Sequence, residues 1–145
     1  MYADLFIRYL HFVGILVLAG SLVSEWLLLK PVHSRAELRR LSLIDAAYGL
    51  ASLLVVGAGL GMWLAGGKPS TYYSDNPIFI TKLVLTGVLG LLSAYPTLFF
   101  IREGRGEASE QVSIPPLVRR LIVAELVVLA CMPALAVLMA VGIGR

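Results

Sequence analysis

Two basic side chains fall inside stretches that are otherwise almost entirely apolar. His11 lies in the segment "LHFVGILVLAGSL", and Lys82 lies in the segment "NPIFITKLVLTGVLGLLSAYPTLFF". A neutral imidazole can donate a lone pair to a metal ion, and a buried ammonium group calls for an anionic partner. Together these two side chains could hold a ligand that is anionic or contains a metal. Each also has a plainer alternative. His11 could simply hydrogen-bond to a neighbouring helix, and the ammonium group of Lys82 could reach the lipid headgroups.

Four more polar side chains lie in or beside apolar stretches: Glu25, Asp45, Tyr95 and Glu125. We expect all four to face the interior of a helix bundle, because lipid does not solvate ionisable groups. Glu25 and Asp45 are predicted to pair with arginines of the adjoining loops. The partner of Glu125 stays open between a nearby arginine, Tyr95 and a group on another helix.

The composition of the chain predicts the helices that carry these residues. The 145 residues are 59% hydrophobic and 14% charged, whereas soluble domains carry roughly 25% charged residues. Four apolar runs, at about 5–29, 42–65, 78–101 and 118–142, are each long enough to cross a bilayer. The sequence therefore predicts an all-α integral membrane protein, a single transmembrane domain over residues 1–145, folded as an up-down four-helix bundle. Its partner is the lipid bilayer. The net charge of +3 does not indicate nucleic acid, because the basic residues adjoin the helix ends.

The loops between the runs differ in charge. Residues 30–40 and 102–120 each carry four Lys or Arg, and residues 66–77 carry one. Basic loops stay in the cytoplasm, so both termini and residues 66–77 are predicted to lie outside. His11 and Lys82 then lie at a similar depth near the outer surface, roughly 9 Å and 6 Å into their helices at 1.5 Å per residue. The four other polar residues belong to the cytoplasmic half. Residues 102–120, which are polar and contain Pro115 and Pro116, are predicted to be a flexible linker.

Small residues and polar stripes predict how the helices face each other. Pairs of small residues four apart, Gly57 with Gly61 and Gly90 with Ala94 among them, are predicted to lie where helices pack closely. On the second run, the inward stripe is predicted to consist of Asp45, Gly49, Ser52, Val56 and Gly59.

The segments "LHFVGILVLAGSL" and "FITKLVL" together resemble the HemJ family of bacterial membrane protoporphyrinogen oxidases, whose wider superfamily includes CopD-type copper-resistance domains. The resemblance implies a haem b cofactor at His11 and Lys82, oxidation of protoporphyrinogen IX, and the inner membrane of a bacterium. A closer resemblance, to an uncharacterised family of bacterial four-helix membrane proteins, covers nearly the whole chain through "YLH", "DAAYGL", "YY" before "NPIF" and "LLSAYPTLFF". It implies no function.

Three functions therefore stay open. The first is a haem-dependent oxidoreductase that acts on a porphyrin or a quinone, with unassigned catalytic residues. The second is a non-enzymatic subunit or assembly factor, in a larger membrane complex or as a homo-oligomer. The third is copper handling, since soft sulfur ligands favour Cu(I). Its ligands would be His11, Cys131, Met62, Met132 and Met139.

Overall fold

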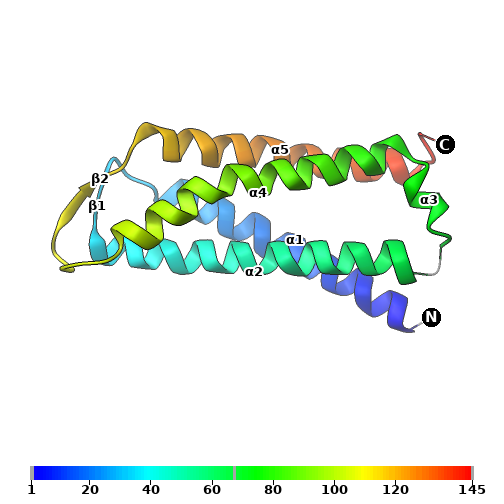
Figure 1. The fold of residues 1–145 in the computed structure, drawn as a ribbon, viewed down its shortest axis with the longest axis horizontal. Coiled ribbons are helices and arrows are strands. Elements are labelled where there is room, and N and C mark those ends of the chain that lie inside the picture. The colour runs from blue at the N-terminus through cyan, green and yellow to red at the C-terminus, as the bar shows by residue number, and fades with distance from the viewer. Residues whose placement is uncertain (1, 67, 145) are drawn as a thin grey trace.

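The computed structural model of the protein describes residues 2–66 and 68–144. Four long helices dominate it: α1 (Tyr2–Leu28), α2 (Arg35–Ala65), α4 (Pro77–Glu103) and α5 (Pro116–Ala140). Successive helices run in opposite directions along the bundle (Figure 1). All four are long and apolar enough to cross a membrane. The predicted all-α, up-down arrangement of four helices is confirmed.

Local capping explains why α2 begins at Arg35 rather than near residue 42. Ser34 and Glu37 form a capping box, in which the Ser34 side chain accepts from the Glu37 backbone and the Glu37 carboxylate accepts from the Ser34 backbone at 2.9 Å. This arrangement satisfies backbone N–H groups that have no partner inside the helix. Asn76 caps α4 in a similar way by accepting from the Ile78 backbone N–H at 2.9 Å. The short helix α3 (Thr71–Ser74), between α2 and α4, was not predicted.

The loop between α1 and α2 and the loop between α4 and α5 are tied together by a small sheet. Strand β1 (Val32–Ser34) pairs antiparallel with β2 (Gln111–Ser113), with His33 opposite Val112. The prediction of a flexible linker is therefore wrong for β2, whose backbone groups pair with a segment far away in sequence.

Arginines at the start of α2 fasten the same region. Arg35 donates to the Glu103 backbone oxygen at 2.8 Å and forms an ion pair with Glu110, and Arg39 donates to the Gly104 oxygen at 3.0 Å. The hydrogen bond from Arg35 holds the pKa of the Glu110 carboxyl below its usual value. This contact therefore contributes stability above that usual pKa and loses it as the pH falls through the lowered one.

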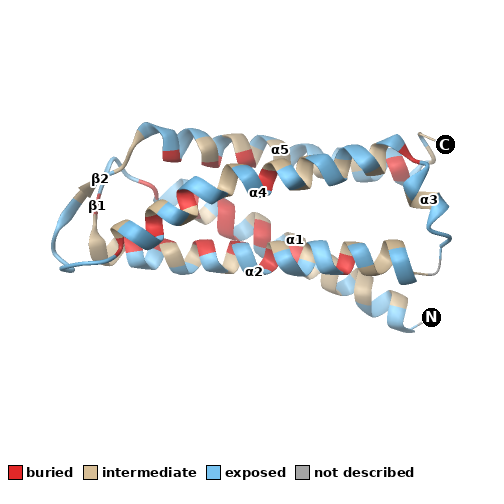
Figure 2. Ribbon diagram, viewed as in Figure 1, coloured by how far each residue is buried: buried red, intermediate tan, exposed pale blue. Residues whose placement is uncertain are grey.

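The buried core occupies one half of the bundle. We call the half that carries β1 and β2 the strand half, and the half with α3 and both chain ends the terminal half. Figure 2 shows most buried positions in and next to the strand half. The core cluster consists of Leu18, Leu22, Leu29, Leu38, Leu41, Tyr48, Ala51, Phe100, Val118 and Ile122. The outward faces of the helices are apolar instead, as with Leu16 and Leu91, which are 72% and 79% exposed. Lipid is the solvent that suits such faces.

Helix α1 packs closely against α2 at Gly14. A Cβ at this position would lie 2.8 Å from Val55 Cγ2, whereas a Cβ at Gly57 or Gly90 would meet nothing within 4 Å. The prediction that Gly57 and Gly90 lie at close helix contacts is therefore wrong, although Gly61 does face Ile7. A spacing of four residues places two glycines on one face of a helix, but it does not say which way that face turns.

Helix α2 is also rotated about its axis relative to the prediction. Gly49 and Val56 are exposed, whereas Tyr48 and Ala51 are buried together with Asp45. The inward stripe of α2 thus lies slightly to one side of the predicted stripe.

The orientation across the membrane stays a prediction. In a Cys131→Ser background, a cysteine in place of Ser70 is expected to react with an impermeant maleimide in intact spheroplasts. A cysteine in place of Ser109 should react only after lysis. Both serines are exposed, and they lie at opposite ends of the bundle. Labelling of Ser109→Cys alone in intact cells would reverse the orientation.

Candidate functional site

His11 is held against α2 in the terminal half. Its Nδ1 lies 2.9 Å from the backbone oxygen of Val55. Because a carbonyl oxygen only accepts, Nδ1 carries the hydrogen and donates it. The Nε2 atom then keeps its lone pair, and it has no hydrogen-bond partner in the described part of the chain. The ring lies over Gly59, where a Cβ would be 3.6 Å from His11 Cε1. A hydrogen bond of this kind fixes both the tautomer and the direction of an imidazole.

Lys82 lies on α4 and is half-buried. Within residues 2–66 and 68–144 its ammonium group has neither a hydrogen bond nor an ion pair, and it interacts electrostatically with His11. The structure thus places His11 of α1 and Lys82 of α4 within electrostatic range of each other. An ammonium group without a counter-ion in this position suits an anionic ligand.

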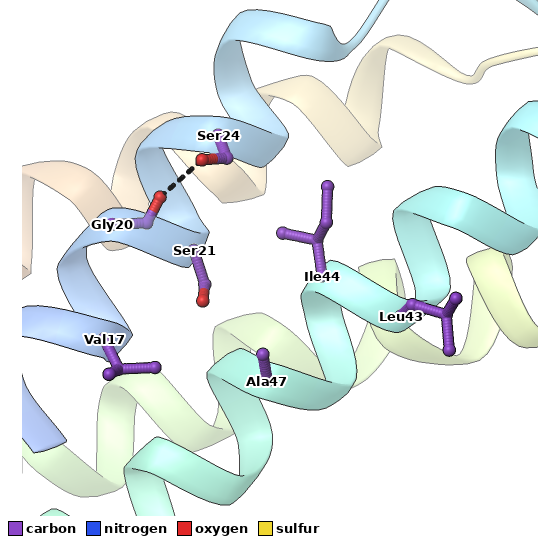
Figure 3. A pocket seen from close by; sticks show the side chains of 7 residues that line it. All are labelled: Val17, Gly20, Ser21, Ser24, Leu43, Ile44 and Ala47. Carbon is purple, nitrogen blue, oxygen red and sulfur yellow. Dashed lines mark hydrogen bonds between the residues drawn. The ribbon is translucent and has the colours of Figure 1, made fainter.

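Two surface grooves lie away from this pair. One runs between α1 and α2 and is lined by Val17, Gly20, Ser21, Ser24, Leu43, Ile44 and Ala47 (Figure 3). Its Ser24 hydroxyl donates to the backbone oxygen of Gly20 at 2.7 Å. The other, on α5, is lined by Pro116, Arg119, Arg120 and Val123. Neither includes His11 or Lys82, so a ligand between those two would border the lipid.

Three buried carboxyl groups lie in the strand half. Glu25 of α1, Asp45 of α2 and Glu125 of α5 are only 2%, 4% and 1% exposed, and we call them the carboxyl cluster. Thr97 of α4 donates to Asp45 Oδ1 at 2.9 Å, and Tyr48 of α2 interacts with Glu125. All four long helices therefore contribute a polar side chain here. The expected interior position of the three acidic residues agrees with their burial, and their roles stay predictions.

The predicted pairing of Glu25 and Asp45 with loop arginines is wrong. Arg35 and Arg39 bind the end of α4 and the loop that follows it, because the capped start of α2 carries them away from the bundle interior. Glu25 Oε1 and Glu125 Oε2 have no hydrogen-bond partner within the described residues. An ionised carboxylate in the middle of a membrane helix costs on the order of 2.5–3.5 kcal/mol, and neighbouring like charges add to that cost.

Tyr95 does not belong to this interior. It is 42% exposed and stacks on Phe99 with ring centroids 6.5 Å apart, so its predicted interior position is wrong. The tyrosine that contacts Glu125 is Tyr48, which sequence reasoning missed. A usable signal existed, because Tyr48 follows Asp45 by one helical turn and therefore shares its face.

The copper hypothesis gains no support from the geometry. Cys131 is exposed on α5. Across the described residues, no three His, Cys, Asp or Glu side chains are grouped so that they could hold a metal ion. His33, the other histidine, lies in the strand half. Its Nε2 accepts a hydrogen bond from the Lys30 backbone at 2.9 Å, and its Nδ1 lies 3.3 Å from Glu37.

The comparisons with known proteins agree with the membrane character of the helices. Residues 3–144 match a family described as "Predicted membrane protein (DUF2214)". No curated protein and no solved structure matches the chain. The match supports the expected uncharacterised membrane-protein family, and none of the comparisons supports a relation to HemJ or to CopD-type proteins.

Proposed function

The chain belongs to the DUF2214 family of predicted membrane proteins, and from that premise we propose that it binds haem b, or another flat anionic ligand, between His11 and Lys82. The observation that carries the proposal is the imidazole of His11, oriented by the Val55 oxygen at 2.9 Å and facing the field of an unpaired Lys82. The proposed setting is the inner membrane of a bacterium, with both termini and the ligand near the outer surface.

The donor set fits a haem. Histidines that ligate metals usually donate their other ring N–H to a carbonyl or carboxylate, as His11 does through Nδ1. The Nε2 lone pair would then be available to hold the haem iron. Lys82 would supply its positive charge to a propionate, or its nitrogen to the iron. Iron held in this way would supply one-electron redox chemistry.

The packing of the terminal half suits a substrate that arrives through the membrane. Buried positions are few there, in contrast to the strand half (Figure 2), so a hydrophobic molecule such as a porphyrin or a quinone could approach from the lipid. The proposed activity is accordingly that of an oxidoreductase acting on such a substrate. His11 positions the cofactor in this scheme, and Lys82 fixes its anionic edge.

An absorption spectrum tests the proposal. Protein expressed with excess haem precursor and purified in detergent is expected to show a Soret band. His11→Ala should abolish it, because no other histidine lies in the terminal half. Lys82→Met should shift or weaken it, because methionine keeps the length of the side chain and loses its charge. His33→Asn and Lys68→Met serve as matched controls, since His33 lies in the strand half and Lys68 lies over the ring of Tyr72 at 3.8 Å. Both should keep the band.

A wild-type protein that stays colourless and binds no added haemin would overturn the haem proposal. Metal analysis of the same sample separates the copper alternative, which requires stoichiometric copper. A colourless and metal-free protein would favour a non-enzymatic subunit of a larger complex. One observation favours that second function: Gly90, Ala94, Ala130 and Ala134 are exposed, and small residues of this kind let a helix of another protein approach closely.

A further inference from the structure

We propose that Glu25, Asp45 and Glu125 form a proton-binding site inside the strand half, which holds exchangeable protons on its carboxyl groups at neutral pH. The site lies apart from His11 and Lys82, and it does not rest on the proposed haem. Three observations carry it: the burial of all three carboxyl groups in one half of the bundle, the unpartnered buried oxygens, and the lack of any ion pair with a cation within the described residues.

The three carboxyl groups act on one another although they come from different helices. Glu25 interacts electrostatically with both Asp45 and Glu125, and Asp45 also interacts with Glu125. Tyr48 interacts with all three. The four groups therefore form one connected set, in which the charge of each depends on the charges of the others.

The unpartnered oxygens point to missing hydrogens. Glu25 Oε1 and Glu125 Oε2 are buried with no hydrogen-bond partner, although their side chains are 98% and 99% buried. An ionised carboxyl only accepts hydrogen bonds, whereas a protonated one also donates. A proton on either group would remove a buried negative charge that has no partner. Buried polar groups in folded proteins are nearly always satisfied in some such way.

No other cation suits the cluster. The faces of α1 and α5 present Glu25 and Glu125, α2 presents Asp45 and Tyr48, and α4 presents the uncharged Thr97. No ion pair or hydrogen bond joins the three carboxyl groups to a lysine, arginine or histidine of the described chain. The two basic residues nearest in sequence to Glu125, Arg119 and Arg120, are exposed. The three carboxyl groups are also not arranged to hold a metal ion, and a proton needs no such arrangement.

Infrared spectroscopy of the protein in lipid nanodiscs tests the proposal. The carbonyl-stretching band of protonated carboxyl groups is expected at neutral pH. It should shift to lower frequency in D₂O and disappear at alkaline pH. The triple variant Glu25→Gln, Asp45→Asn, Glu125→Gln should lose the band, and each single variant should lower it. Glu107→Gln, at an exposed position, is the matched control and should leave it unchanged.

Two results would overturn the proposal. Wild-type protein without the band at neutral pH would show that all the carboxyl groups are ionised. A band that neither shifts in D₂O nor responds to alkaline pH would show neutral acids that are sealed and only structural. Both measurements use the wild-type chain, so they decide even if the triple variant fails to fold. His11→Ala should retain the band, which separates this test from the haem test.

Discussion

Gly14→Leu is expected to lower the free energy of unfolding by about 1–3 kcal/mol, the usual cost of overpacking a close contact. Even the Cβ of the new side chain would lie 2.8 Å from Val55 Cγ2 and 3.4 Å from the backbone oxygen of Ala51. The β-branched Val55 has little rotamer freedom in a helix with which to move aside, so α1 and α2 must separate. Thermal melts in detergent measure the loss.

Gly14→Leu should also weaken the hydrogen bond that orients His11. Val55 supplies the carbonyl oxygen that accepts from His11 Nδ1, so a displaced α2 lengthens this hydrogen bond. Gly57→Leu is the matched control, because a Cβ there meets nothing within 4 Å. It should be neutral or stabilising, since glycine in a helix costs about 0.5–1 kcal/mol relative to alanine. Equal losses for Gly14→Leu and Gly57→Leu would contradict the close contact at Gly14.

Glu125→Leu is expected to lower the free energy of unfolding by about 1–3 kcal/mol, the penalty for a buried polar group that loses its partner. The group left behind is the hydroxyl of Tyr48, which is itself only 4% exposed. Glu125→Gln should stay close to wild type, because the amide resembles a protonated carboxyl in shape and can both donate and accept. Detergent melts of the three proteins give the comparison.

Exposed positions provide the reference for this series. Glu107→Leu and Glu107→Gln change the same side chains outside the bundle and should both have little effect. Equal melting temperatures for wild type, Glu125→Leu and Glu125→Gln would contradict the burial of Glu125, which is 1% exposed. They would instead place its carboxyl group in contact with water.

Much of the fold could be predicted from the sequence, because the bilayer constrains it so strongly. A span must be apolar over roughly 20 residues and must satisfy its own backbone, which leaves a helix as the available solution. The four runs and their alternating directions follow from that requirement. The inward faces of α1 and α4 were also predictable, since Glu25 and Thr97 lie on polar stripes in otherwise apolar helices.

The tertiary structure alone decided how each helix is rotated and which residues meet. The periodicity of a helix defines a face, but lipid and protein interior are both apolar, so small shifts in that face leave little trace in the sequence. Among the open partners of Glu125, the structure selects a group on another helix, Tyr48, and not Tyr95. Gly14, and not Gly57, lies at a close helix contact.

Contacts between distant segments form the other part that the sequence did not reveal. The pairing of β1 with β2, residues 32–34 with 111–113, joins loops that look merely polar and basic. The same holds for the carboxyl cluster, whose members lie on three helices and 20 or more residues apart along the chain. The sequence by itself determined that these groups are ionisable and face inward. Only the packing of α1, α2 and α5 places them in one half of the bundle without a paired cation, because Arg35 and Arg39 bind the end of α4 and the loop after it, and Arg119 and Arg120 are exposed.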